Sequence, residues 1–250
     1  MRVRLVLEYD GTDFAGYQLQ PEHPSIQGAV EQALGVALRH PVRIAVAGRT
    51  DSGVHARMQV VAFDSEPPIA LDRLRAALNG LLPSSIGCVE AEEAAPDFDP
   101  RRTPHRKQYI YRWLDRPGRS PLRARYSWHV NRRLDEVAMA AGAANLVGQH
   151  DFTSFRAAGC AARTPVRTLP RIEVLRVGDE VHLITEGTGY LRHMIRIMAG
   201  TLLEVGRGAR PPTWVGDVLA ARDRSAAGKT APAKGLTLEW IRYTAESTPP

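Results

Sequence analysis

The hydrophobic residues of this chain recur with two periods that alternate along the sequence. Residues 2–10 carry an apolar side chain at every second position from Val3 to Tyr9, which is the pattern of a half-buried β-strand. Residues 26–38 carry apolar side chains every three or four positions, as in an amphipathic helix, and Ser25 is placed to be its N-cap. Strands in hairpin-like pairs with helices between them predict an α+β fold with largely antiparallel sheets.

The same two periods predict the other elements and their division into halves. We expect helices at residues 71–82, 134–147 and 190–205, and strands at residues 42–46, 58–64, 86–90, 107–114, 126–130, 171–177, 181–186 and 236–243. Prolines and glycines gather in residues 116–125, which is typical of a boundary. We therefore expect an N-terminal α/β half at residues 1–115, a C-terminal α/β half at residues 126–243 and a loose tail at residues 244–250.

The composition of the chain restricts the class of protein to which it can belong. With 250 residues, of which 44% are hydrophobic and 24% are charged, the chain resembles an average soluble globular protein and can bury a core. No apolar run approaches the roughly 18 residues that span a bilayer. Residues 1–6 are too short and too alternating for a signal peptide, so we expect a cytoplasmic protein. Cys88 and Cys160 are far apart without metal-ligand spacing, and they predict neither a disulfide framework nor a zinc site.

The charge of the chain indicates an anionic partner. The formal net charge is +6 and the isoelectric point is near 9.7, as in many proteins that bind nucleic acid. Lys107, Lys229 and Lys234 are the only lysines among the 33 residues that are Lys or Arg. Arginine suits bidentate contacts with phosphate and stacking on bases. A GC-rich genome would give the same bias without functional meaning, so both explanations stay open.

Residues 47–56 (AGRTDSGVHA) are the main candidate for a reactive site. They place Asp51 two residues after Arg49, between two glycines and directly after an expected strand. If the segment is extended, the side chains of Arg49 and Asp51 point to the same side. A carboxylate beside a guanidinium stays ionised, because the opposite charge favours its charged form, and it can act as an acceptor or a nucleophile. A surface turn with a local Arg–Asp pair explains the same residue types equally well.

An aromatic face follows a basic loop in the middle of the chain. In the strand expected at residues 107–114, the rings of Tyr109, Tyr111 and Trp113 lie on one face. A base can stack on such a face, and stacking stabilises binding by roughly 1–3 kcal/mol per base. Packing into the hydrophobic core is the alternative for each of these rings.

A glycine-flanked helix supplies the third candidate segment. In the helix expected at residues 190–205, Arg192 and Arg196 lie one turn apart on one side. They form either a substrate contact or a solvated basic stripe. We expect this helix, the aromatic face and Asp51 to meet in one cleft.

Six motifs in order along the chain resemble the tRNA pseudouridine synthase A family. They are YDGTDFAGYQ at residues 9–18, AGRTDSGVHA at 47–56, RKQYIY at 106–111, DFTSFR at 151–156, GTGYLRHMIRIMAGTLLEVG at 187–206 and APAKGLTLEWIRY at 231–243. The resemblance covers nearly the whole chain, and six ordered motifs are far more specific than any one of them.

The resemblance implies the pseudouridine synthase fold, with two α/β halves around a central catalytic cleft. It implies an enzyme that isomerises uridine to pseudouridine at positions 38, 39 and 40 in the anticodon stem-loop of tRNA, as a homodimer and without a metal or an organic cofactor. The family's catalytic nucleophile falls on Asp51 and its uracil-stacking tyrosine on Tyr109. The arginine that pairs with the nucleophile falls on Arg196, and the motif arginine that contacts nucleotide or backbone falls on Arg49.

Four positions depart from the family pattern. Ser52 stands in place of alanine, Gln108 in place of a basic residue, Tyr190 in place of phenylalanine and Ile197 in place of asparagine. None of these changes removes a group that the reaction requires, so they bear on local RNA contacts.

Two other functions would use the same residues. A non-catalytic module that binds structured RNA would use the basic loop and the aromatic face without forming a product. A carboxylate-dependent hydrolase or nuclease would need a second acidic ligand near Asp51. The nearby sequence, from Arg49 to His55, contains no other acid, which argues against this second alternative.

Overall fold

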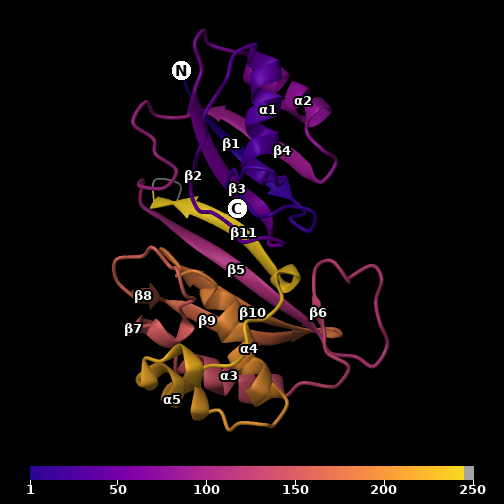
Figure 1. Ribbon diagram of the computed structural model, residues 1–250, viewed down its shortest axis with the longest axis vertical. Helices are drawn as coiled ribbons and strands as arrows, with labels where there is room; N and C mark the ends of the chain where they lie inside the picture. Colours follow the sequence, from indigo (N-terminus) through magenta and orange to yellow (C-terminus); the bar gives the residue numbers. More distant parts are fainter. Residues whose placement is uncertain (245–250) are drawn as a thin grey trace. The chain divides into compact units, whose positions relative to one another are not determined.

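The computed structural model describes residues 1–244, so the tail expected at 244–250 lies outside the described residues except for Thr244. The chain forms two compact units (Figure 1). The first unit contains residues 1–105 and the C-terminal strand from Leu238 onward, and the second contains residues 106–237. The halves at 1–115 and 126–243 remain a prediction about domain organisation, whereas these units separate after His105 and after Thr237.

The first unit is built on a sheet with strand order β4-β1-β3-β11, and β2 pairs with β3. Its elements are β1 (Arg2–Tyr9), α1 (Ile26–Leu38), β2 (Ala45–Val46), β3 (His55–Asp64), α2 (Leu71–Leu81), β4 (Ile86–Glu93) and β11 (Leu236–Tyr243). β1 pairs antiparallel with β3 and with β4, and in this register Leu5 lies opposite both Val61 and Ala91. Helices α1 and α2 pack against each other, and α2 packs on β4 (Figure 1).

Local hydrogen bonds explain which elements of this unit the sequence predicts correctly and which it does not. The Ser25 side chain accepts a hydrogen bond from the backbone N–H of Gly28, which confirms Ser25 as the N-cap of α1. The strand expected at residues 42–46 is wrong in length, because β2 contains only its last two residues. Upstream of β2, the backbone N–H of Ile44 donates to the Glu31 carboxylate on α1 and is therefore not available to the sheet.

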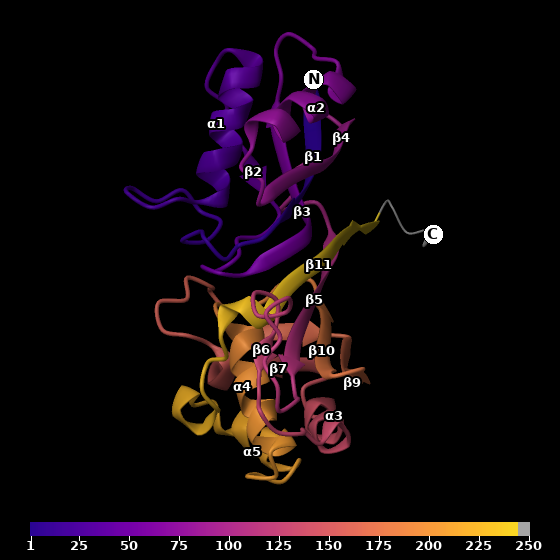
Figure 2. The ribbon, with the colours of Figure 1, turned by 90° about the vertical axis from the view of Figure 1, so that its right-hand side faces the viewer.

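The second unit has a sheet with strand order β5-β10-β9, and a separate pair of strands, β7 and β8. Helices α3, α4 and α5 lie together on one side of the larger sheet in both views (Figures 1 and 2), and α3 packs on β9 and α4. The elements are β5 (His105–Leu114), β6 (Trp128–His129), α3 (Glu136–Ala144), β7 (Gly148–Asp151), β8 (Val166–Leu169), β9 (Arg171–Val177), β10 (Glu180–Gly187), α4 (Met194–Gly206) and α5 (Trp214–Ala221).

At α4 the structure clearly differs from the helix that the sequence predicts. The helix expected at residues 190–205 begins at Met194, because His193 has a φ of 60° in the left-handed region, which a right-handed helix does not contain. Arg192 therefore lies before the helix, and it does not share a helical face with Arg196. The backbone of Arg192 bonds instead to residues 157–160, where its carbonyl accepts from the N–H of Ala157.

Two further expectations change in the second unit. The strand expected at residues 126–130 shortens to β6, because the backbone N–H groups of Tyr126 and Ser127 both donate to the Arg123 carbonyl in a turn. Three short elements, β7, β8 and α5, were not predicted from the sequence. The expected fold class is confirmed, since the mixed α+β structure has a mostly antiparallel sheet.

Candidate active site

The loop between β2 and β3 carries Arg49 and Asp51 in the first unit. Arg49 is exposed, Asp51 is half-buried, and Thr50 between them is 8% exposed. This alternation fits the extended segment expected from the sequence, in which Arg49 and Asp51 share one side while Thr50 faces the core. The carbonyl of Asp51 accepts a hydrogen bond from the N–H of Val54, which closes the turn that leads into β3.

A buried network of polar groups holds this loop from below. The Tyr9 hydroxyl lies 2.8 Å from Oγ1 of Thr50, and Nε2 of Gln59 donates both to the Tyr9 hydroxyl, at 3.2 Å, and to the Gly48 carbonyl, at 2.8 Å. In the contact between Tyr9 and Thr50 either hydroxyl can be the donor. Burial raises the pKa of Tyr9 to about 12, so the Tyr9 hydroxyl keeps its proton at neutral pH. The backbone on both sides of Arg49 is therefore fixed.

The loop at residues 11–18 packs directly against the Asp51 loop. The N–H of Tyr17 donates to the Thr50 carbonyl at 3.0 Å, and Oγ of Ser52 donates to the Phe14 carbonyl at 3.0 Å. Gly16 has a φ of +113°, and a Cβ there would lie 3.1 Å from the backbone of Thr50 and Ser52. Only glycine combines this conformation with this approach. The serine that departs from the family pattern thus joins two loops by a hydrogen bond.

The aromatic face expected in the second unit is present on β5, and all three of its rings are buried. Tyr111 and Trp113 are completely buried, so the core alternative holds for these two rings. Tyr109 is 8% exposed, and it forms an edge-to-face pair with Tyr190, with ring centroids 5.1 Å apart and an interplanar angle of 79°. The Tyr190 hydroxyl donates to the Lys107 carbonyl, which fixes the orientation of this edge-to-face pair.

Arg196 lies in the first turn of α4 and is half-buried. Its Nε donates to the Ala231 carbonyl at 2.9 Å, and its own carbonyl accepts from the N–H of Ala231 at 3.0 Å. The neighbouring Pro232 carbonyl accepts from the Tyr111 hydroxyl. Burial raises the pKa of Tyr111, and the positive charge of Arg196 opposes part of that rise. The segment at 231–232 therefore connects the arginine to the aromatic strand.

Close contact between α4 and residues 228–230 makes this connection rigid. A Cβ on Gly200 would clash with the carbonyl oxygen of Lys229, so only glycine allows the two backbones to meet. The N–H of Gly228 donates to Oγ1 of Thr201, which in turn donates to the carbonyl of Ile197 one turn earlier in the helix. Ile197 is completely buried, so its side chain belongs to the core of this unit.

Comparison with known proteins identifies the family. The family model described as tRNA pseudouridine synthase matches residues 5–101 and 143–244. The tRNA pseudouridine synthase A of Myxococcus xanthus is 49% identical over 243 residues, which cover 97% of this chain and 92% of the relative. The enzymes of the same name from Geobacter sulfurreducens and Brevibacillus brevis are 46% and 45% identical, over 96% and 97% of this chain and 99% of each relative.

The chain belongs to the tRNA pseudouridine synthase family. The resemblance inferred from the six motifs is thereby confirmed, and the relatives match nearly the full length of the chain. Two features of this tRNA pseudouridine synthase family member were not predicted from the sequence. The first is the network of Tyr9, Thr50 and Gln59, because Tyr9 and Gln59 look like ordinary strand positions. The second is the set of contacts that Arg196 makes with Ala231, which lies 35 residues away.

Metal clusters and membrane-spanning helices are both absent from residues 1–244 of this family member. No group of three or more His, Cys, Asp and Glu side chains there is arranged to hold a metal ion. No helix within the same residues is long and apolar enough to cross a membrane.

Proposed function

We propose that this chain isomerises uridine to pseudouridine at positions 38, 39 and 40 of the tRNA anticodon stem-loop, with Asp51 as the catalytic carboxylate. Its family consists of tRNA pseudouridine synthases, which are isomerases. The proposal includes a homodimer that works without metal or organic cofactor and acts on tRNA in the cytoplasm. Tyr109 stacks on the uracil, Arg196 pairs with Asp51, and Arg49 contacts the nucleotide or its backbone.

The reaction explains why a carboxylate is needed. The C1′–N1 bond of uridine breaks, the uracil rotates, and C5 bonds to C1′; C5 loses its proton to water and N1 gains one, so no atoms are lost overall. Three routes use an ionised carboxylate: addition to the uracil ring, attack on the sugar carbon, or removal of a proton. The uridine must first leave its stack, which costs a few kcal/mol.

The observation that carries the proposal is the support of the Asp51 loop. A catalytic carboxylate must be held within a fraction of an ångström, and buried partners achieve this better than surface contacts. Thr50 and Gly48, on the two sides of Arg49, both bond to the buried pair Tyr9 and Gln59, while Asp51 itself is half-buried. A simple surface turn has no need of such support.

Release of a labelled proton tests the activity directly. Incubating tRNA whose uridines carry tritium at C5 with the protein and EDTA is expected to release tritium to water, because C5 exchanges its hydrogen for the glycosidic bond. Mapping the modified sites is expected to place them at positions 38–40. Absence of release from several tRNAs that nevertheless bind would support the RNA-binding module instead, and loss of activity in EDTA would contradict a metal-free reaction.

Replacing Tyr9 by phenylalanine tests the support of the loop. The variant loses the hydroxyl that bridges Thr50 and Gln59, so we expect kcat to fall on the order of tenfold or more, because small displacements of a catalytic group are costly. We expect KM to change less than twofold. Steady-state kinetics on tRNA measure both constants.

Tyr243→Phe is the matched control for Tyr9→Phe. It removes another buried hydroxyl of the first unit, whose partner is the Pro100 carbonyl at 2.8 Å, far in sequence from the Asp51 loop. Its thermal unfolding is expected to shift by a similar amount without a fall in kcat. Equal loss of kcat in both variants would show that Tyr9 matters only for stability.

A further inference from the structure

Residues 116–134 form an unusually basic stretch, which we call the arginine segment. It contains no aspartate or glutamate and six arginines, namely Arg116, Arg119, Arg123, Arg125, Arg132 and Arg133. Their formal charge equals the net charge of +6 of the whole chain. The segment lies outside residues 5–101 and 143–244, which the family model matches. The family model therefore says nothing about the role of this segment.

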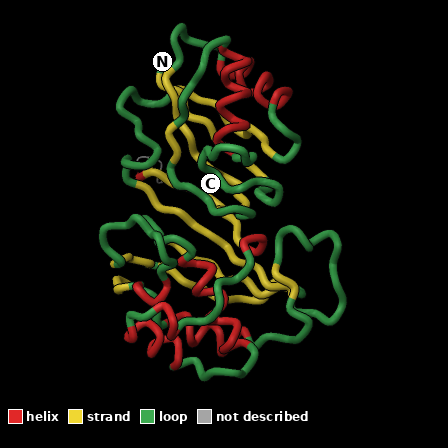
Figure 3. The backbone as a smooth tube through the Cα atoms, viewed as in Figure 1, coloured by secondary structure: helices red, strands yellow, loops and turns green. Residues whose placement is uncertain are grey.

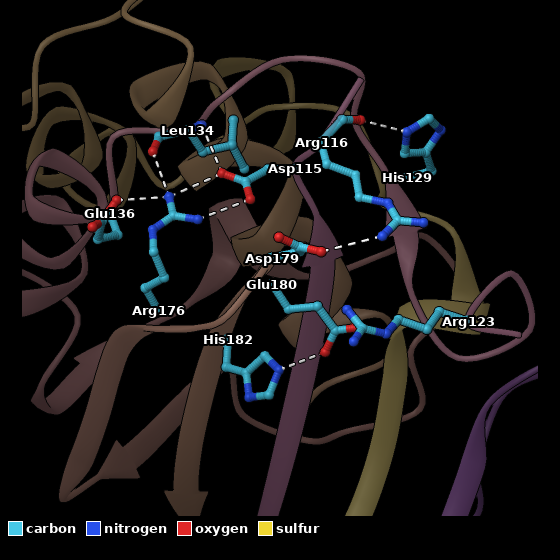
Figure 4. A network of polar contacts seen from close by, with 10 residues as sticks. All are labelled: Asp115, Arg116, Arg123, His129, Leu134, Glu136, Arg176, Asp179, Glu180 and His182. Atoms are coloured by element: carbon cyan, nitrogen blue, oxygen red, sulfur yellow. Dashed lines mark hydrogen bonds and ion pairs between the residues drawn. The ribbon is translucent and has the colours of Figure 1, made fainter. Parts of the chain in front are cut away.

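Both ends of the arginine segment are tied to one carboxylate. Asp115, directly before it, has a fully buried side chain and receives two hydrogen bonds from Arg176, at 2.8 and 2.9 Å (Figure 4). The same carboxylate accepts from the N–H of Leu134, the last residue of the segment, and Arg176 also donates to the Leu134 carbonyl. Arg176 also forms an ion pair with Glu136, at 2.8 Å. This clamp brings the two ends of the segment together.

The interior of the segment is ordered as well, although Figure 3 shows the connection from β5 to β6 as a long loop. Arg116 donates to the carbonyls of Gly118 and Arg119 and pairs with Asp179 on the β9–β10 turn. The Arg116 carbonyl lies 2.8 Å from Nε2 of His129, which belongs to β6. These contacts hold the backbone that carries Arg119 before any partner binds, which lowers the entropy that binding must overcome.

The arginines differ in how far their charge is neutralised. Arg116 pairs with Asp179, and Arg123 lies 3.9 Å from Glu180, which also contacts His182 (Figure 4). Arg119 and Arg132 are exposed, and neither forms an ion pair within the described part of the chain. These two side chains stand on the ordered loop with their charge facing water. An anionic partner is the natural complement of such a surface.

We propose that the arginine segment is a second RNA-binding surface, which holds phosphates of the tRNA through Arg119 and Arg132 outside the reaction site. The inference rests on the proposed function, because that function supplies tRNA as the anionic partner. Leu114, the last residue of β5, is five residue steps from Tyr109, which at about 3.3 Å per step is about 17 Å, and the segment begins two residues later. The flipped uridine cannot reach that far, so the segment binds the RNA backbone that flanks it.

The double variant R119A/R132A tests this surface against R73A/R75A. The control also removes two exposed arginines, from α2, and leaves the arginine segment intact. In R119A/R132A we expect KM for tRNA to rise about tenfold at about 0.1 M salt with kcat unchanged. Each lost phosphate contact lowers the salt dependence of binding, so the slope of log Kd against log salt flattens by about 2.

Binding and turnover are measured separately, so that failure of the second RNA-binding surface can be distinguished from failure of the proposed function. Kd for tRNA is determined in an Asp51→Ala background, and product formation in the active enzyme. Normal turnover with Kd and KM equal in R119A/R132A and R73A/R75A would overturn the second surface and leave the proposed function standing. Absence of product from the unmodified protein, with tRNA binding that still depends on Arg119 and Arg132, would overturn the proposed function alone. A changed oligomeric state of R119A/R132A in light scattering would assign the surface to contacts between copies of the chain and overturn the inference.

Discussion

Asp51→Ala is expected to abolish pseudouridine formation while tRNA binding persists. The variant removes the carboxylate on which the proposed reaction depends, and loss of a nucleophile lowers turnover on the order of 10⁴-fold or more. The proposed binding surface consists of arginines and an aromatic ring, so Kd for tRNA is expected to stay within a few-fold of the original. Tritium release from C5 measures the first quantity, and filter binding or fluorescence anisotropy the second.

Two further variants make this result specific to residue 51. Asp51→Asn keeps the size of the side chain and removes its charge, and it is expected to be as inactive as Asp51→Ala. Asp97→Ala removes an exposed acid elsewhere in the first unit and is expected to turn over normally. Substantial product from clean Asp51→Ala protein would refute the assignment of the catalytic carboxylate.

Asp115→Ala is expected to reduce the free energy of unfolding by about 3–5 kcal/mol, because removing one partner of a buried ion pair leaves the other uncompensated. The Asp115 side chain is fully buried and shares with Glu136 the neutralisation of Arg176, whose own side chain is 15% exposed. The N–H of Leu134 also loses its acceptor. Hydrogen bonding from Arg176 lowers the pKa of Glu136 to about 2, so Glu136 remains ionised and supplies part of the compensation.

Urea denaturation compares Asp115→Ala with the exposed pair nearby. Asp179→Ala breaks the ion pair with Arg116, in which the Asp179 side chain is 51% exposed, and it is expected to cost less than about 1 kcal/mol. Asp115→Leu combined with Arg176→Met is expected to recover much of the loss, because a packed apolar pair can replace a buried ion pair. Equal unfolding midpoints for Asp115→Ala and Asp179→Ala would rule out a stabilising role for the clamp.

The hydrophobic periods of the sequence predict the long elements well, since their pattern comes from burial on one face. They fail where a single local contact decides the backbone. Ile44 looks like a strand residue, but its N–H bonds to Glu31, and His193 lies within a helical pattern, yet its backbone is left-handed. The short elements β7, β8 and α5 are too brief for a period to be recognised.

The candidate site, too, is predicted from the sequence only in part. The chemistry of Arg49 and Asp51 is visible in ten consecutive residues, because charged groups between glycines are a local feature. Their support is not visible, because Tyr9 and Thr50 are 41 residues apart and a strand tyrosine has the same pattern whether it anchors a loop or fills a core. The partnership of Asp115 and Arg176, 61 residues apart, likewise emerges only from the folded chain.

The clamp at Asp115 separates changes within the arginine segment from the rest of the second unit. With its two ends fastened to the same carboxylate and guanidinium, the stretch between them can change in length and content without disturbing the sheet that carries Tyr109. Insertions, deletions and substitutions within residues 116–134 are therefore expected to leave the strand that carries Tyr109 in place.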